Sequence, residues 1–98
     1  IDKSKLSIVV YNGTGSDGFA AQAAQILQSK GYTVQETGNA DSAVYTETLV
    51  IYKDTEDEAA AEAIVADLGV GRAVYASVYY NLKTDIQVVV GSDWKPVR

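Results

Sequence analysis

Apolar residues occur along this chain either in short continuous runs or at helical spacing. Nearly continuous apolar runs at 6–11, 48–52 and 85–91 predict β-strands buried in the centre of a sheet. Residues 32–37 alternate between apolar and polar side chains, which predicts a half-exposed strand. A further strand is expected within 73–80.

The segment after the first strand has the spacing of an amphipathic helix. Its apolar side chains recur every three or four residues, as expected where one helix face packs on a sheet. Gly31 follows the last of them and is a typical residue to end a helix. Ser16 or Asp17 is expected to cap the helix start by accepting a hydrogen bond from a free backbone N–H group. The predicted stripe consists of Phe19, Ala20, Ala23, Ala24 and Leu27.

A second helix is predicted after the strand at 48–52. Thr55 and Glu58 have the spacing of a capping box, and Gly69 ends the segment. The expected core face of this helix consists of Ala60, Ile64 and Leu68, widened by Ala61 and Val65. The order strand–helix–strand thus occurs twice before the last strand, and right-handed crossovers place both helices on one face. The predicted fold class is therefore α/β (α+β), a two-layer sandwich with a βαββαββ-like mixed sheet. The strands before each helix and the last strand are expected to be central.

The composition narrows the class of function. A chain of 98 residues is expected to form a single domain over 1–98, with its core at about 6–94. The net charge of −5 gives no broad electrostatic reason to bind nucleic acid or an anionic membrane. His and Cys are absent, which excludes disulfides and thiolate metal sites and removes the commonest general base. We expect no metal and no cofactor.

The chain starts at Ile1 rather than at Met, so we expect a fragment of a longer protein. No apolar run approaches the roughly 18 residues of a membrane-spanning helix, so no direct membrane insertion by this segment is expected. An anchor, if the parent protein has one, is expected outside this chain.

A glycine-rich turn, NGTGSDG, joins the first strand to the first helix. Gly13, Gly15 and Gly18 have the G-x-G-x-x-G spacing of dinucleotide-binding turns, and Glu36 lies near the position of their ribose-binding acid. The chain is short for such a fold, and no Walker-type lysine follows, which excludes a P-loop. Either Gly13 and Gly15 supply positive φ for a sharp turn and Gly18 lets the helix pack close to the sheet, or the free N–H groups at the helix start bind an anion or sugar hydroxyls.

The end of the last strand is the second part of the candidate site. If this strand is parallel to the first, polar side chains of both converge at one edge of the sheet, with an aromatic ring for stacking. Alternatively, Asp93 accepts hydrogen bonds from backbone N–H groups of the turn and has only a structural role. The candidate binding residues are Asn12, Gly13, Thr14, Gly15, Asp17, Gly18, Asp93 and Trp94.

Tyrosine is over-represented, with seven residues against one Phe and one Trp. Tyr75, Tyr79 and Tyr80 gather around the predicted fourth strand and are a candidate surface for a glycan or a partner protein. The alternative is a small sheet whose edges are finished with amphipathic rings. The acidic run at 54–62 is interpreted as a solvated helix face rather than a calcium site, because it lacks the EF-hand spacing.

Two segments together resemble the LytR C-terminal domain family. The first is VVYNGTGSDGFAAQAAQILQSKGYTV, with a strand, Asn-Gly, a loop, Gly-hydrophobic-Ala, a helix and Gly-aromatic-x-Val. The second is VVVGSDW, which is similar to the usual ending of a hydrophobic strand, Gly, a variable residue and Asp. The resemblance covers about Leu6 to Trp94.

The resemblance implies an extracellular module of a cell-envelope protein that is membrane-anchored through a segment outside this chain. Many such modules follow a LytR–CpsA–Psr catalytic domain, which transfers lipid-linked glycopolymers to peptidoglycan. The module itself is then expected to be a non-catalytic accessory or binding unit, with a wall glycan or a partner envelope protein as ligand. Two alternatives are a small anion-binding or enzymatic unit at Asn12–Gly18, and a self-association module that uses an open sheet edge.

Overall fold

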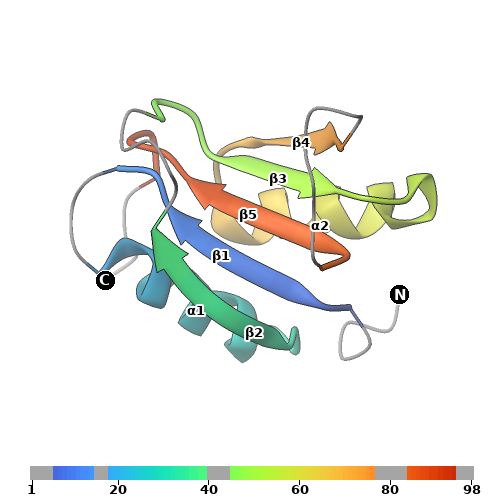
Figure 1. Ribbon diagram of the computed structural model, residues 1–98, viewed down its shortest axis with the longest axis horizontal. Coiled ribbons are helices and arrows are strands. Elements are labelled where there is room, and N and C mark those ends of the chain that lie inside the picture. Colours follow the sequence, from blue (N-terminus) through green and yellow to red (C-terminus); the bar gives the residue numbers. More distant parts are fainter. Residues whose placement is uncertain (1–5, 15–17, 40–44, 77–83, 95–98) are drawn as a thin grey trace.

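The computed structural model describes residues 6–14, 18–39, 45–76 and 84–94. In these ranges the chain forms five strands, two α-helices and a short 3₁₀ turn (Figure 1). In chain order they are β1 (Ile8–Asn12), α1 (Phe19–Ser29), β2 (Val34–Asn39), β3 (Leu49–Tyr52), η2 (Thr55–Asp57), α2 (Glu58–Leu68), β4 (Arg72–Tyr75) and β5 (Ile86–Val90). Each predicted element is present with shifted ends, and the part of the predicted fourth strand beyond 76 lies outside the described residues.

The sheet is mixed, with the strand order β2-β1-β5-β3-β4. β1 is parallel to both β2 and β5, whereas β3 is antiparallel to β5 and parallel to β4. The three strands with continuous apolar sequences, β1, β5 and β3, therefore lie in the centre, as predicted. The carboxyl ends of β1 and β5 meet at the end of the sheet where β3 begins.

Both helices pack on the same face of the sheet, behind the strands in Figure 1, which confirms the two-layer prediction. The predicted stripes face this interface, because Ala23 and Leu27 of α1 and Ala61 and Ile64 of α2 are fully buried. Short alanine side chains let the helices lie close to the strands. The strand side chains beneath them are Ile8, Val10, Val50, Tyr52, Ile86, Val88 and Val90.

The opposite face of the sheet carries no helix in the described part of the chain. Val9, Ile51 and Val89 on this face are nevertheless at most 4% exposed. The central strands are thus buried on both sides, which explains why their sequences are continuously apolar rather than alternating. Neither of the two described helices is long and apolar enough to cross a bilayer.

The start of the second helix differs from the prediction. Thr55 opens the 3₁₀ turn, α2 begins at Glu58, and no side chain caps either element. The Glu58 carboxylate instead accepts a hydrogen bond from the Tyr52 hydroxyl at 3.2 Å. The capping box is therefore not formed, because a tertiary contact with β3 uses the carboxylate that local spacing assigned to the helix start.

Candidate functional site

The ends of β1 and β5 lie side by side, as the predicted parallel pairing requires. Asn12 is the register partner of Val90, and the Gly13 N–H donates a hydrogen bond to the Val90 carbonyl at 2.8 Å. The glycine-rich turn and the end of the last strand therefore meet at one edge of the sheet. The contacts of each residue show what it does there.

Asn12 closes the turn that follows β1. Its side chain is buried, and its Oδ1 accepts hydrogen bonds from the Thr14 N–H at 2.9 Å and from the Thr14 hydroxyl at 2.6 Å. An Asn side chain that bonds the backbone two residues ahead takes the place of a backbone turn. These polar groups therefore stabilise the turn itself.

The glycines of the turn have different roles from those predicted. Gly13 does not have a positive φ, but a Cβ there would lie 2.7 Å from the Tyr45 ring, so close packing requires the glycine. Gly18 does have a positive φ, of 89°, and is itself the N-cap of α1, without a side-chain cap. The predicted caps Ser16 and Asp17, together with the candidate binding residue Gly15, lie outside the described residues.

Asp93 joins β5 to the start of β3 rather than to the glycine-rich turn. Its Oδ1 accepts hydrogen bonds from the Thr48 N–H at 2.9 Å and from the Thr48 hydroxyl at 2.8 Å. The Thr48 Oγ1 in turn accepts a hydrogen bond from the Gly91 N–H at 3.0 Å. Gly91 is required because a Cβ there would lie 2.6 Å from the Glu47 carbonyl oxygen. The prediction that Asp93 binds the turn glycines is thus corrected, since its partner is the fully buried Thr48.

Trp94 belongs to the core and offers no stacking surface for a sugar. It is 1% exposed, and its ring packs edge-on against Phe19, with centroids 5.9 Å apart and an interplanar angle of 78°. It therefore locks the tail of β5 onto the start of α1. The ending VVVGSDW is explained by packing and internal hydrogen bonds.

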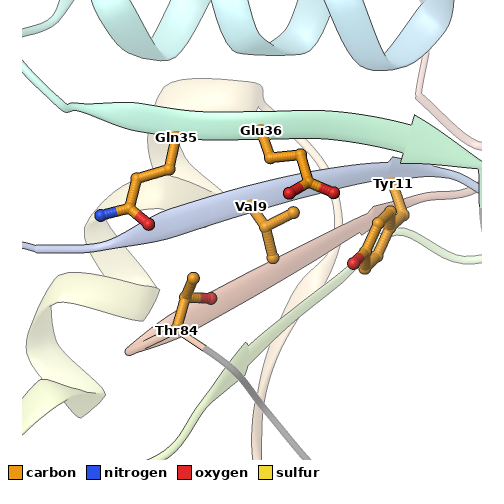
Figure 2. Close-up of a pocket in the computed structure, with 5 residues that line it drawn as sticks. All are labelled: Val9, Tyr11, Gln35, Glu36 and Thr84. Carbon is orange, nitrogen blue, oxygen red and sulfur yellow. The ribbon is translucent and has the colours of Figure 1, made fainter.

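A shallow hollow of about 130 Å³ lies on the helix-free face of the sheet, at the β1–β2 pair (Figure 2). Val9 is at its centre, and polar side chains surround it: Tyr11 from β1, Gln35 and Glu36 from β2, and Thr84 from the residues before β5. Of these residues, the sequence pattern indicates Glu36, near the position of a ribose-binding acid. The other four residues are not part of any binding motif predicted from the sequence.

An irregularity in β2 builds this hollow. Ile8 pairs with Val34 but Val9 pairs with Glu36, so Gln35 is an extra residue in β2. A bulge of this kind re-aims side chains, and Figure 2 shows Gln35 and Glu36 both directed to the side of the sheet on which Val9 lies. A glycine in β2 makes room for the ring on the neighbouring strand, because a Cβ at Gly38 would lie 3.3 Å from the Tyr11 ring.

The rim of the hollow is polar and negatively charged. Among the described residues that line it, Glu36 carries the only charge, and both Gln35 and Glu36 are exposed to solvent. The Thr84 hydroxyl already donates a hydrogen bond to the Ile86 carbonyl at 2.8 Å, so its oxygen remains as an acceptor. Carboxylate, amide and hydroxyl groups around an apolar floor suit a neutral or cationic polar ligand.

Three carboxylates gather at the end of the sheet away from the glycine-rich turn, where β3 ends and β5 begins. Asp54, Asp57 and Asp85 each place an oxygen within 4.8 Å of the others. Burial, followed by the charges of Asp85, Asp54 and Glu56, raises the pKa of Asp57. The Asp85 Oδ2 accepts a hydrogen bond from the Ser7 N–H at 3.2 Å and so ties this corner together. Asp54 and Asp57 of the acidic run at 54–62 therefore repel each other. The tertiary structure brings Asp85, from a separate segment, into the same cluster.

The tyrosine surface is described only in part. Tyr75 is 50% exposed at the end of β4, and its ring packs against Tyr52 at a centroid distance of 5.6 Å. Tyr79 and Tyr80 lie outside the described residues. Tyr75 thus has the half-packed position that amphipathic aromatic residues favour.

Comparison with known proteins agrees with this architecture. Residues 5–94 match the family LytR_C, described as LytR cell envelope-related transcriptional attenuator. A cell wall biosynthesis protein, LcpA of Corynebacterium glutamicum, is 36% identical over 90 residues, which is 92% of this chain and 17% of that protein. A vesiculogenesis and immune response regulator of Mycobacterium tuberculosis is 36% identical over 66 residues, which is 66% of this chain and 40% of that protein. The chain thus spans less than half the length of either relative.

Two solved structures have the same fold. One is the soluble domain of a conserved hypothetical secreted protein from Mycobacterium marinum, with a TM-score of 0.75 and 19% identity over 96% of this chain and 64% of that chain. The other is the C-terminal domain of RV0431, with a TM-score of 0.64 and 29% identity over 90% of this chain and 73% of that chain. Sequence match, relatives and fold agree, and the chain belongs to the LytR_C family of cell-envelope proteins.

Proposed function

We propose that this domain is a non-catalytic, extracellular accessory module of a cell-envelope protein and that it holds wall glycopolymer for a separate catalytic domain. The observation that carries the proposal is the hollow on the helix-free face, with an apolar floor and polar walls. Membership of a cell-envelope family and the relative named for cell wall biosynthesis support the location. The parent protein is proposed to be membrane-anchored outside this segment.

The chemistry of the chain supports a binding role over a catalytic one. It has no His and no Cys, so the commonest general base and the thiol nucleophile are unavailable. At the sheet edge with the glycine-rich turn, where the sequence predicts a site, Thr48 donates hydrogen bonds to Asp93. Their hydrogen bonds serve the fold, which leaves the surface of the hollow as the better candidate for ligand contact.

Co-sedimentation of the 98-residue chain with purified, insoluble cell wall tests this proposal. We expect a fraction of the protein to pellet with the wall and to return to the supernatant when soluble wall fragments are added. Bovine serum albumin, another acidic protein, serves as the control for non-specific adsorption. Wild-type protein that stays in the supernatant at every wall concentration would refute a glycan-binding role.

A second candidate function is self-association through β4. This strand is last in the order of the described sheet, and an unpaired strand edge is a template for another chain. The exposed Tyr75 at its end would add an aromatic contact. Sedimentation velocity over a hundredfold range of protein concentration tests this function. A sedimentation coefficient that stays at the monomer value throughout would exclude self-association.

A further inference from the structure

We propose that the hollow around Val9 binds one sugar ring that carries no negative charge, and that an amino or acetamido substituent on this ring is recognised by Glu36 and Gln35. The inference rests on the proposed glycan-binding function and specifies its site and ligand class. It is carried by the shape, the hydrogen-bonding groups and the charge of the hollow.

The shape sets the size of the ligand. A volume of about 130 Å³ is well below the roughly 300–1,000 Å³ of pockets that enclose drug-sized molecules. Val9 supplies a buried apolar floor, and the Tyr11 ring stands at one side of it (Figure 2). A sugar ring has apolar C–H faces and polar edges, so it matches an apolar floor with polar groups at the rim.

The hydrogen-bonding groups favour a ligand rich in donors. Glu36 only accepts hydrogen bonds, and the Thr84 oxygen is left as an acceptor because its proton is directed to the Ile86 carbonyl at 2.8 Å. Gln35 offers both an acceptor and two donors, and the Tyr11 hydroxyl offers one of each. Hydroxyl, amide N–H and ammonium groups supply the donors that this set requires.

The charge of the hollow disfavours anionic units. Glu36 is the single charged group among the described lining residues, and the whole chain carries a net charge of −5. A phosphodiester or carboxylate in the hollow would be repelled, whereas an ammonium group would form an ion pair with Glu36. Because Glu36 is exposed, we expect the ion pair to add only about threefold to fivefold in affinity.

Titration of ¹⁵N-labelled chain, followed by NMR, tests this site with three probes: tetra-N-acetylchitotetraose, its deacetylated tetramer, and a poly(glycerol phosphate) chain. We expect both saccharides to shift the amide signals of residues 9, 11, 35, 36 and 84, with dissociation constants of about 1 mM. The deacetylated tetramer should bind more tightly, and the anionic polymer should leave these signals unchanged.

Matched variants separate recognition from general charge. Glu36→Gln removes the charge but keeps a side-chain oxygen as acceptor, and the exposed position leaves the core intact. It should therefore abolish the preference for the amine and weaken binding of the deacetylated tetramer more than that of the acetylated one. Glu62→Gln makes the same change of charge on the exposed surface of α2, in the helix layer, and should alter neither affinity.

Three results would overturn the assignment. These are saccharide shifts confined to another surface, stronger binding of the anionic polymer at these residues, and an unchanged amine preference in Glu36→Gln. If the wild-type chain pellets with cell wall but one of these results is obtained, the ligand class or site is wrong and the accessory function stands. If it does not pellet at all, the proposed function itself fails.

Discussion

Replacing Asp93 by Ala should destabilise the fold substantially, because the Asp93 carboxylate is the acceptor for two groups of a fully buried threonine. Its Oδ1 accepts from the Thr48 N–H at 2.9 Å and from the Thr48 hydroxyl at 2.8 Å. Hydrogen bonds to a charged group contribute about 1.5–3 kcal/mol each, so their joint loss has an upper limit near 6 kcal/mol. Asp93 itself is exposed, so water can enter at the truncated side chain and bond to Thr48, which recovers part of the lost free energy.

We therefore expect a loss of about 2–3 kcal/mol in the free energy of unfolding. At about 4–8 °C per kcal/mol for a domain of this size, the melting temperature should fall by about 8–24 °C. Thermal unfolding followed by circular dichroism measures this change directly. Asp93→Asn keeps an acceptor oxygen, so its free energy of unfolding should fall by less, about 1 kcal/mol.

Ser92→Ala is the matched control, since Ser92 is exposed beside Asp93 and its replacement should change stability by no more than about 0.5 kcal/mol. An Asp93→Ala protein that melts within about 2 °C of the wild type would refute the structural role. Wall binding distinguishes the two roles of this residue: below its melting temperature, Asp93→Ala should still pellet with cell wall. Selective loss of binding in a stable variant would restore Asp93 to the binding site.

Three further predictions concern close packing and ionisation. Gly91→Ala should lower the free energy of unfolding by about 2 kcal/mol or more in urea denaturation, because its Cβ would overlap the Glu47 backbone. Asp57→Asn should raise stability at pH 7 by about 0.5 kcal/mol. The pKa of Asp57 is higher in the folded than in the unfolded state, so the charge of Asp57 destabilises the folded state of the wild type. The advantage of Asp57→Asn should therefore disappear as the pH falls below 3.8, where Asp57 and its acidic neighbours become protonated in the folded and the unfolded state. Burial and the nearby Asp67 raise the pKa of Tyr32 from 10.0 to about 12, so the folded state holds this proton longer than the unfolded state. Wild-type stability should therefore fall more steeply than that of Tyr32→Phe as the pH rises from 10.0 to about 12, measured by urea titration at each pH.

Most of the fold was predictable because its determinants are local. The spacing of Ala23 and Leu27 is enough to define the buried stripe of α1, and Gly31 and Gly69 end the two helices with positive φ values. The continuous apolar sequences of β1, β3 and β5 indicate central strands. The handedness of βαβ crossovers then places both helices on one face.

The candidate site was less predictable, since its residues depend on long-range pairing. Thr48 carries no local signal, and its partner Asp93 is 45 residues away. The extra residue Gln35 in β2 is visible only in the register with β1, and no pattern in β2 indicates it. Besides Glu36, Tyr11 was a sequence signal for this hollow, as a large polar-tipped ring at an outward position of a buried strand.

The sequence by itself determined the class of fold, the family and the buried face of each helix, because hydrophobic periodicity and glycine positions act over a few residues. Tertiary structure alone decided which polar side chains serve the fold and which remain for a ligand. Parallel pairing of β1 and β5 brings the two motifs together as expected, but Thr48 and the core then take up Asp93 and Trp94. The polar groups left around Val9 come from three separate segments, and only the register of β1, β2 and β5 assembles them.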